Sequence, residues 1–315
     1  MVELPPLNLG RHKTSTMKNL TILDGGMGRQ LKRMGAPFSQ PWWSAASLIE
    51  APHYVTQAHQ EFIAAGANII TANSYACVPF HLGEALYQER GCALATYAAA
   101  LAKEAADKAQ QNVLVAGSLP PPFGSYRPDL FDSNRAFDIL NDLMQAQDDH
   151  VDLWLVETIA SIEEGLIAAN VLKGSTKPCY YAFTLSDEVS SSAKLRSGEP
   201  VSQAIEAILS QNIAGIFFNC SIPEAMAQAI RDTTEALATH NRSIDIGAYA
   251  NSFTPISKDH QANDSIQDYR ELSPEEYLAF AKHWYQLGAR IIGGCCGIGP
   301  EHIALLSQWQ KSINN

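Results

Sequence analysis

Three cysteines of this sequence are placed so that their thiols could bind one metal ion. Cys220 ends a short apolar segment, and Cys295 and Cys296 stand together in a glycine-rich one, Gly293-Gly294-Cys295-Cys296-Gly297. Two neighbouring ligands require the backbone to bend, and the flanking glycines supply that freedom. Thiolates favour zinc over magnesium or calcium, and three protein ligands leave a fourth tetrahedral position open, as in catalytic zinc sites. We therefore predict a Zn²⁺ ion held by these three cysteines.

The expected chemistry follows from the charge of such a site. A zinc ion with three thiolate ligands carries a net negative charge, so it is a poor Lewis acid for water but can still hold a further thiol as a thiolate at neutral pH. That sulfur could attack an electrophilic carbon, such as the methyl group of a sulfonium, from which a neutral thioether leaves. Little proton handling is needed, and the sequence shows no dedicated acid–base pair.

Other uses of the cysteines stay open. A vicinal disulfide, or a redox protein that cycles the Cys295–Cys296 pair, would need no metal but would leave Cys220 without a purpose. A zinc-binding or thiol-binding barrel without catalytic activity is a further alternative. Free cysteine is also often a small buried hydrophobic residue. We interpret the remaining three in this way: Cys77, Cys92 and Cys179.

Two acidic residues at the ends of apolar segments could bind a substrate amine. Asp24 precedes Gly25 and Gly26, so its carboxylate would lie beside exposed backbone amides, which suits the ammonium and carboxylate groups of an amino acid. Glu157 could supply the second anion. Taken alone, either acid could equally be a helix cap or a solvated loop residue.

Four other residues are weaker candidates. Trp42 and Trp43 could form a wall of the substrate pocket, although packing in the core explains them equally well. His59 and His302 are interpreted as helix residues, and we assign them no functional role.

Eight short apolar segments that end in turn residues are predicted as strands. Nearly every position in them is apolar, as expected for strands that are buried on both faces. They cover residues 20–25, 68–75, 113–119, 153–158, 179–185, 215–220, 245–251 and 290–295.

Amphipathic helical patterns lie between these segments, with apolar residues at i, i+3, i+4 and i+7. Typical helix-end residues accompany them, namely Ser161 with Glu164, Ser273 with Glu276, Pro274, Pro300 and Gly288. Eight strand–helix units favour a closed (β/α)8 TIM barrel over an open sheet. We predict one such domain over residues 18–315, after a loose tail over residues 1–17. Its active face would be built at the C-terminal strand ends, with residues 119–128 and 186–200 among its loops.

Composition narrows the class of protein. The chain has 315 residues, of which 46% are hydrophobic and 17% are charged, enough for a large core. The net charge of −11 argues against binding to nucleic acid or to an anionic membrane surface. No segment reaches the length of about 18 apolar residues that a spanning helix needs. We expect a cytoplasmic protein that acts on small molecules; the sequence does not indicate its oligomeric state.

The motifs resemble those of the homocysteine S-methyltransferase family, zinc barrels with S-methylmethionine-dependent and betaine-dependent members. The resemblance spans nearly the whole chain, through residues 23–28, 66–75, 157–158, 218–221, 249–252 and 293–297. It implies that Cys220, Cys295 and Cys296 bind zinc and that Asp24 and Glu157 hold the amino group of homocysteine.

The resemblance extends to further substrate contacts. It implies that the amides of Gly25 and Gly26 hold the homocysteine carboxylate, that Asn73 belongs to the substrate-binding residues, and that Asn219 supports them from behind. The implied product is methionine, with S-methylmethionine or S-adenosylmethionine as the sulfonium donor. Residues 118–125 depart from the family pattern, so the donor stays open, and selenocysteine or another small thiol stays an alternative acceptor.

Overall fold

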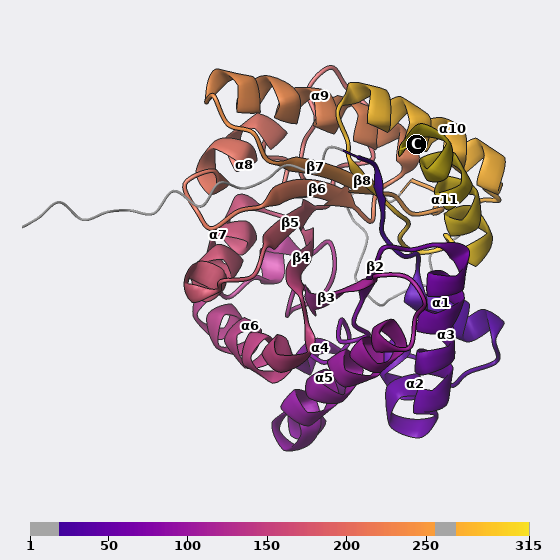
Figure 1. Ribbon diagram of the computed structural model, residues 1–315. Helices are drawn as coiled ribbons and strands as arrows, with labels where there is room; N and C mark the ends of the chain where they lie inside the picture. Colours follow the sequence, from indigo (N-terminus) through magenta and orange to yellow (C-terminus); the bar gives the residue numbers. More distant parts are fainter. Residues whose placement is uncertain (1–18, 256–268, 315) are drawn as a thin grey trace, which may run out of the picture.

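Parallel strands form a closed ring at the centre of the structure, a computed structural model that describes residues 19–255 and 269–314 (Figure 1). The strands are β1 (Thr21–Ile22), β2 (Ile69–Thr71), β3 (Leu114–Leu119), β4 (Leu153–Ile159), β5 (Cys179–Phe183), β6 (Gly215–Asn219), β7 (Asp245–Tyr249) and β8 (Ile291–Ile292). Their order in the sheet is β1-β8-β7-β6-β5-β4-β3-β2. The ring closes where Leu23 and Ile69 form a parallel bridge. The predicted (β/α)8 barrel is confirmed, while the tail predicted over residues 1–17 lies outside the described residues.

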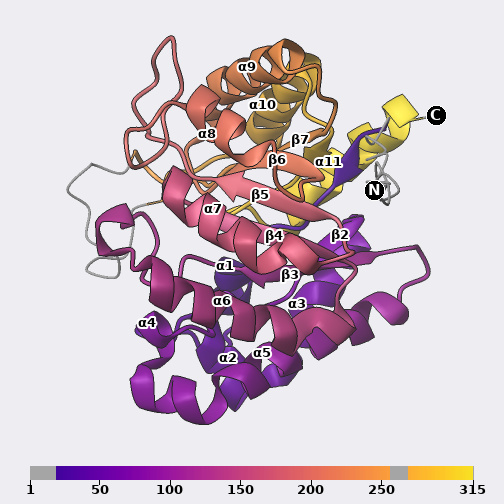
Figure 2. The same cartoon turned by 90° about the vertical axis from the view of Figure 1, so that its left-hand side faces the viewer.

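Helices alternate with the strands along the chain and surround the barrel (Figures 1 and 2). The α-helices are α1 (Met27–Arg33), α2 (Ser44–Glu50), α3 (Pro52–Ala65), α4 (Pro79–Leu82), α5 (Glu84–Asp107), α6 (Ser133–Gln147), α7 (Ile162–Val171), α8 (Val201–Ile208), α9 (Pro223–Thr239), α10 (Pro274–Leu287) and α11 (Pro300–Asn314). Short 3-10 helices are η1 (Pro128–Leu130), η2 (Asp148–His150) and η3 (Leu172–Gly174). None of the helices described is long and apolar enough to span a membrane.

The helix-end residues act as the sequence predicts. Ser273 caps α10 in a complete capping box with Glu276, and Pro274 and Pro300 begin α10 and α11. The Ser161 hydroxyl accepts the Glu164 amide at the start of α7. These caps satisfy backbone amides that a helix leaves without a partner, so they define where the helices begin.

The barrel interior is filled rather than hollow. Its apolar cluster consists of residues on the strands and at their ends, including Leu155, Phe217 and Ile291. The rings of Tyr180 and Phe217 stack there, with centroids 4.9 Å apart. Every residue of β5, β6 and β7 is buried, as expected for strands covered by helices outside and by side chains inside. A binding site is therefore expected at the mouth of the barrel and not in its interior.

Strands β1 and β8 are shorter than predicted. Residues 20–25 and 290–295 are expected as strands from the sequence, but regular pairing ends after Ile22 and Ile292. Beyond these residues the two segments pack on each other: a Cβ on Gly293 would lie 2.6 Å from Leu23 Cβ, and the Gly294 amide donates to Asp24 O at 2.9 Å. The two chain segments therefore leave the sheet together at the barrel mouth.

Candidate active site

A cavity of about 280 Å³ opens at the C-terminal ends of the strands. Its wall contains residues that end a strand or follow one, so the cavity lies at the end of the barrel where the sequence predicts the active face. Among them are Asp24 after β1, Thr71 at the end of β2, Glu157 in β4 and Cys220 after β6. The cavity therefore collects side chains that are far apart in the sequence.

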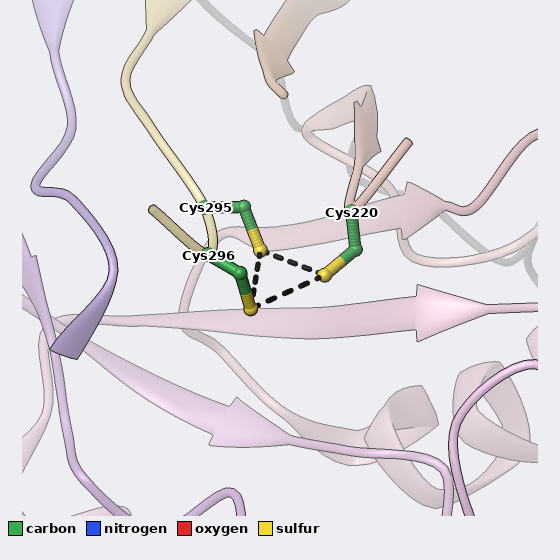
Figure 3. Close-up of side chains that lie close together, drawn as sticks. All are labelled: Cys220, Cys295 and Cys296. Atoms are coloured by element: carbon green, nitrogen blue, oxygen red, sulfur yellow. Dashed lines mark hydrogen bonds between the residues drawn. The ribbon is translucent and has the colours of Figure 1, made fainter. Parts of the chain in front are cut away.

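The three predicted cysteines converge on this cavity. Figure 3 shows their side chains pointing toward one another, with Cys220 on one segment and the Cys295–Cys296 pair on another. The Sγ–Sγ distances are 2.8 Å for Cys220–Cys295, 3.9 Å for Cys220–Cys296 and 4.0 Å for Cys295–Cys296. All three exceed the length of about 2.05 Å of a disulfide bond, so the structure holds no vicinal disulfide here.

The cluster can be compared with what a metal ion needs. Thiolates at about 2.3 Å from a tetrahedral zinc lie roughly 3.8 Å from one another. Two of the three sulfur distances match that value, and Cys220 and Cys295 would separate by about 1 Å to match the third. No other group of three or more potential ligands was found in the part of the chain that the structure describes. The cluster is thus suited to a soft metal ion.

Local backbone conformation turns the thiols inward. Cys220 has a φ of +50°, a left-handed conformation that is uncommon for a residue with a side chain, and it ends β6 one residue earlier than predicted. Gly297 has a φ of +90°, which glycine adopts readily, and it lets the chain turn after Cys296. Gly293 and Gly294, by contrast, serve close packing: a Cβ on Gly294 would lie 2.2 Å from Ile298.

The sulfur atoms share protons unequally. Hydrogen bonds from the Cys295 and Cys296 thiols hold the pKa of Cys220 well below its usual range. The same contact with Cys220 raises the pKa values of Cys295 and Cys296. One sulfur therefore carries negative charge readily while its neighbours act as donors.

The two predicted carboxyl groups line the same cavity. Asp24 accepts hydrogen bonds from the backbone amide of Thr71 at 2.7 Å and from its hydroxyl at 3.2 Å. Glu157 accepts from the Ser118 hydroxyl at 2.5 Å and from the Tyr249 hydroxyl at 3.4 Å. Burial raises the pKa of Asp24 to about 8 and that of Glu157 to about 7. Buried acids with raised pKa values in a cavity are suited to binding a cation.

One of the two predicted carboxylate-binding amides is already used. The Gly26 amide donates to the carbonyl oxygen of Ile298 at 2.9 Å, so it is not free for a substrate carboxylate. This contact arises because residues 24–26 pack on the segment after β8. Gly25 lines the cavity, and its amide has no acceptor among the described residues.

The two predicted asparagines have different positions. Asn73 lines the cavity and donates to the Ser44 carbonyl oxygen at 3.2 Å. Asn219 is fully buried and does not line the cavity, so it lies behind the residues that could contact a substrate. Its amide instead bonds both the backbone and the hydroxyl of Thr158, at 3.0 and 3.1 Å. It therefore fixes the end of β4 beside Glu157.

Aromatic residues form much of the remaining wall, and the sequence alone singled out only one of them. Trp43 lines the cavity, whereas Trp42 packs against the core. The other aromatic residues are Phe38, Tyr75, His81, Tyr126, Tyr249, Phe253 and Tyr269. Tyr249 could have been found because it ends a strand, but Tyr126 lies in a loop whose course no periodicity predicts.

The residues without an assigned role stay outside the cavity. His59 is buried in α3, and His302 accepts the Gly299 amide at the start of α11. Cys77 and Cys179 are buried as interpreted, but Cys92 is exposed on α5, which corrects that interpretation.

Among the five non-glycine residues described with positive φ, four line the cavity: Trp43, Tyr126, Thr158 and Cys220. Backbone strain of this kind often gathers at functional sites.

Comparisons with known proteins agree with this geometry. A profile of the family described as homocysteine S-methyltransferase matches residues 21–309. Homocysteine S-methyltransferase 1 of Arabidopsis thaliana is 28% identical, with 91% of this chain and 92% of the relative covered. The selenocysteine methyltransferase of Astragalus bisulcatus is 25% identical, with 90% of each chain covered.

A solved structure shows the same architecture. The metallated form of the homocysteine methyltransferase MmuM of Escherichia coli superimposes with a TM-score of 0.75 and 25% identity. The match covers 93% of this chain and 96% of that protein. Because the family profile spans most of the sequence and the fold agrees, the chain belongs to the homocysteine S-methyltransferase family.

Proposed function

We propose that this enzyme transfers a methyl group to the thiol of homocysteine, giving methionine, and that it does so with zinc at Cys220, Cys295 and Cys296 and a sulfonium compound as donor. Methyl transfer to homocysteine is the activity of the family to which the chain belongs. The observation that carries the site assignment is that three thiols and two carboxyl groups, from different strand ends, face one cavity.

Asp24 and Glu157 would bind the ammonium group of homocysteine. An ammonium ion beside both acids would lower their raised pKa values, because a nearby opposite charge favours the ionised form. Thr71 and Tyr249 hold the two carboxyl groups in place by hydrogen bonds. The amino acid would thereby be oriented with its thiol toward the cysteines.

Zinc, when bound by the three thiolates, would lower the pKa of a further coordinating thiol so that it is deprotonated at neutral pH. The homocysteine sulfur would form a bond to the methyl carbon as the bond from that carbon to the donor sulfur breaks. The donor leaves as a neutral thioether, so no side chain has to protonate it. The chain's residues therefore orient the reactants and exclude water rather than move protons in this step.

The cavity wall supports a cationic donor. A sulfonium ion is attracted to the faces of aromatic rings, and Trp43, Tyr75 and Tyr126 are among the aromatic residues of the wall. Burial lowers the pKa of His81 to about 4, which leaves Arg29 as the one cationic side chain among the described wall residues, beside two carboxyl groups and three thiols. Both features favour S-methylmethionine or S-adenosylmethionine over an anionic or neutral donor.

A donor panel tests this proposal. Purified protein with one equivalent of zinc is given homocysteine and, in turn, S-methylmethionine, S-adenosylmethionine and glycine betaine, and methionine is measured. We expect turnover with at least one sulfonium donor, and turnover with betaine alone would contradict the proposed class of donor. Selenocysteine as acceptor in the same assay tests the alternative substrate. Metal-loaded protein that transfers methyl from no donor would support the rival interpretation, a barrel that binds zinc without catalysis.

A further inference from the structure

A buried ion pair lies in the loop between β5 and α8. No residue of this loop lines the cavity. Arg196 Nη2 and Asp187 Oδ2 are 3.0 Å apart, and the two side chains are only 8% and 3% exposed. Burying two charges is costly unless hydrogen bonds and geometry compensate for their lost hydration. A pair this deeply buried in a loop therefore calls for a specific role.

Arg196 reaches the carbonyl oxygen of Cys220 by two routes. Its Nε donates to the Thr184 hydroxyl at 3.5 Å, and that hydroxyl donates to Cys220 O at 3.3 Å. Its guanidinium carbon also lies 4.9 Å from the centroid of the Tyr126 ring, and the Tyr126 hydroxyl donates to the same carbonyl oxygen at 3.2 Å. One cation thus holds both side chains that bond this carbonyl.

Asp187 binds the other side of the same turn. Its Oδ1 accepts the backbone amide of Ile222 at 3.2 Å, two residues after Cys220. The Ser221 hydroxyl, between them, accepts the amide of Leu185 at 2.7 Å. The loop after β5 therefore holds residues 220–222 through the carbonyl oxygen at one end and the Ile222 amide at the other. Cys220 has its left-handed conformation in this turn.

We propose that the Arg196–Asp187 ion pair is a positioning device for Cys220: it keeps the two hydroxyl donors on the Cys220 carbonyl oxygen and so keeps the thiol turned toward Cys295 and Cys296. This inference rests on the proposed metal site. A left-handed residue without such support would relax to an ordinary conformation, and its side chain would turn away. The ion pair would thereby set the metal affinity from outside the cavity.

Metal affinity tests the inference without any assay of methyl transfer. The double variant Arg196→Met/Asp187→Asn removes both charges, so no buried charge is left alone, and the new asparagine side chain can still accept the Ile222 amide. Tyr126→Phe removes one hydrogen bond to Cys220 and keeps the ion pair. Zinc binding is measured by competition with a chromophoric chelator, and cobalt replaces zinc to report thiolate ligation through its charge-transfer absorption. Circular dichroism checks that each variant is folded.

We expect the double variant to bind zinc at least tenfold more weakly than the parent and Tyr126→Phe to bind it severalfold more weakly. We also expect the cobalt complex of the double variant to absorb less in the charge-transfer band than that of the parent. Lys177→Met, which breaks the ion pair of Lys177 with Asp148 outside this network, is the matched control and should bind zinc within twofold of the parent. A zinc affinity of the double variant within twofold of the parent would overturn the proposal, whatever the effect of Tyr126→Phe. If the double variant does not fold, Tyr126→Phe tests one of the two hydrogen bonds through which the ion pair is proposed to act, and a zinc affinity within twofold of the parent would then overturn the proposal.

The outcome separates this inference from the proposed function. Variants with weakened metal binding in a protein that methylates nothing would uphold the positioning role and count against the activity. Variants with unchanged metal binding in an enzyme that methylates homocysteine would uphold the activity and count against the positioning role.

Discussion

Gly26 packs directly on the backbone of Cys295: a Cβ at Gly26 would lie 2.5 Å from the Cys295 carbonyl oxygen. The contact joins the segment that carries Asp24 to the segment that carries two of the three cysteines. The Gly294 amide, which donates to Asp24 O, reinforces this contact. The carboxyl group proposed to bind the substrate amine and the thiols proposed to bind the metal are therefore parts of one packed unit, and a disturbance of one should reach the other.

Substituting Gly26 by Ala should disturb both halves of the site. The added methyl group meets backbone atoms that cannot rotate away, and overpacking of this kind costs about 1–3 kcal/mol. We expect a higher KM for homocysteine together with weaker zinc binding and a lower unfolding temperature. Gly174→Ala is the matched control, since no atom lies within 4 Å of a Cβ there. A Gly26→Ala enzyme with parental KM and zinc affinity would show that the two segments are not coupled.

Removing one cysteine of the cluster should abolish metal binding and catalysis together. For Cys296→Ala we expect zinc content well below one equivalent after dialysis and a fall in kcat/KM of at least a hundredfold, because two thiolates bind the metal far more weakly than three. Cys92→Ala, which changes an exposed cysteine on α5, should leave both unchanged. Elemental analysis and initial rates measure the two effects. Full activity in Cys296→Ala would exclude the proposed role of the cluster.

Asp24→Asn should weaken the binding of homocysteine through its amino group. Asparagine can still accept the Thr71 amide, so the local structure is kept while the negative charge is lost. A hydrogen bond to a charged group contributes about 1.5–3 kcal/mol, which corresponds to a rise in KM of roughly tenfold to a hundredfold. The acceptor 4-mercaptobutyrate, which lacks the amino group, is the control substrate. Equal losses with both acceptors would argue that Asp24 acts on something other than the amine.

The raised pKa values predict how stability depends on pH. Folded Asp24 and Glu157 keep their protons up to about pH 8 and 7, while the unfolded chain loses them near their ordinary values. The contribution of these protons to the free energy of unfolding is thus complete at low pH. It is lost as pH rises from the ordinary pKa of each group to its raised pKa in the folded protein, by up to about 1.4 kcal/mol per pH unit for each group.

This pH effect can be isolated by difference. In metal-free protein without substrate, the free energy of unfolding should fall between pH 5 and pH 8 more steeply for the parent than for the Asp24→Asn/Glu157→Gln variant. Urea titrations at several pH values measure both. Parallel pH profiles for the two proteins would mean that these carboxyl groups are not held protonated in the folded state.

The sequence sufficed for those parts of the site that follow from regular structure. Alternation of apolar strands and amphipathic helices predicted the barrel, and the rule that active groups lie at strand ends placed Asp24, Glu157 and the cysteines in one cavity. The use of the Gly26 amide by Ile298 was not predictable, because it depends on how two irregular segments pack. Arg196 was missed for a similar reason, since its contacts with Thr184 and Tyr126 join two loops and a strand end.

The most direct test of the account is X-ray absorption spectroscopy at the zinc edge, recorded on the zinc-loaded protein before and after addition of homocysteine. We predict three sulfur ligands at about 2.3 Å and one lighter ligand in the free protein, and four sulfur ligands once homocysteine is bound. A sulfur count that does not change on adding homocysteine at saturating concentration would contradict the claim that the metal activates the acceptor thiol.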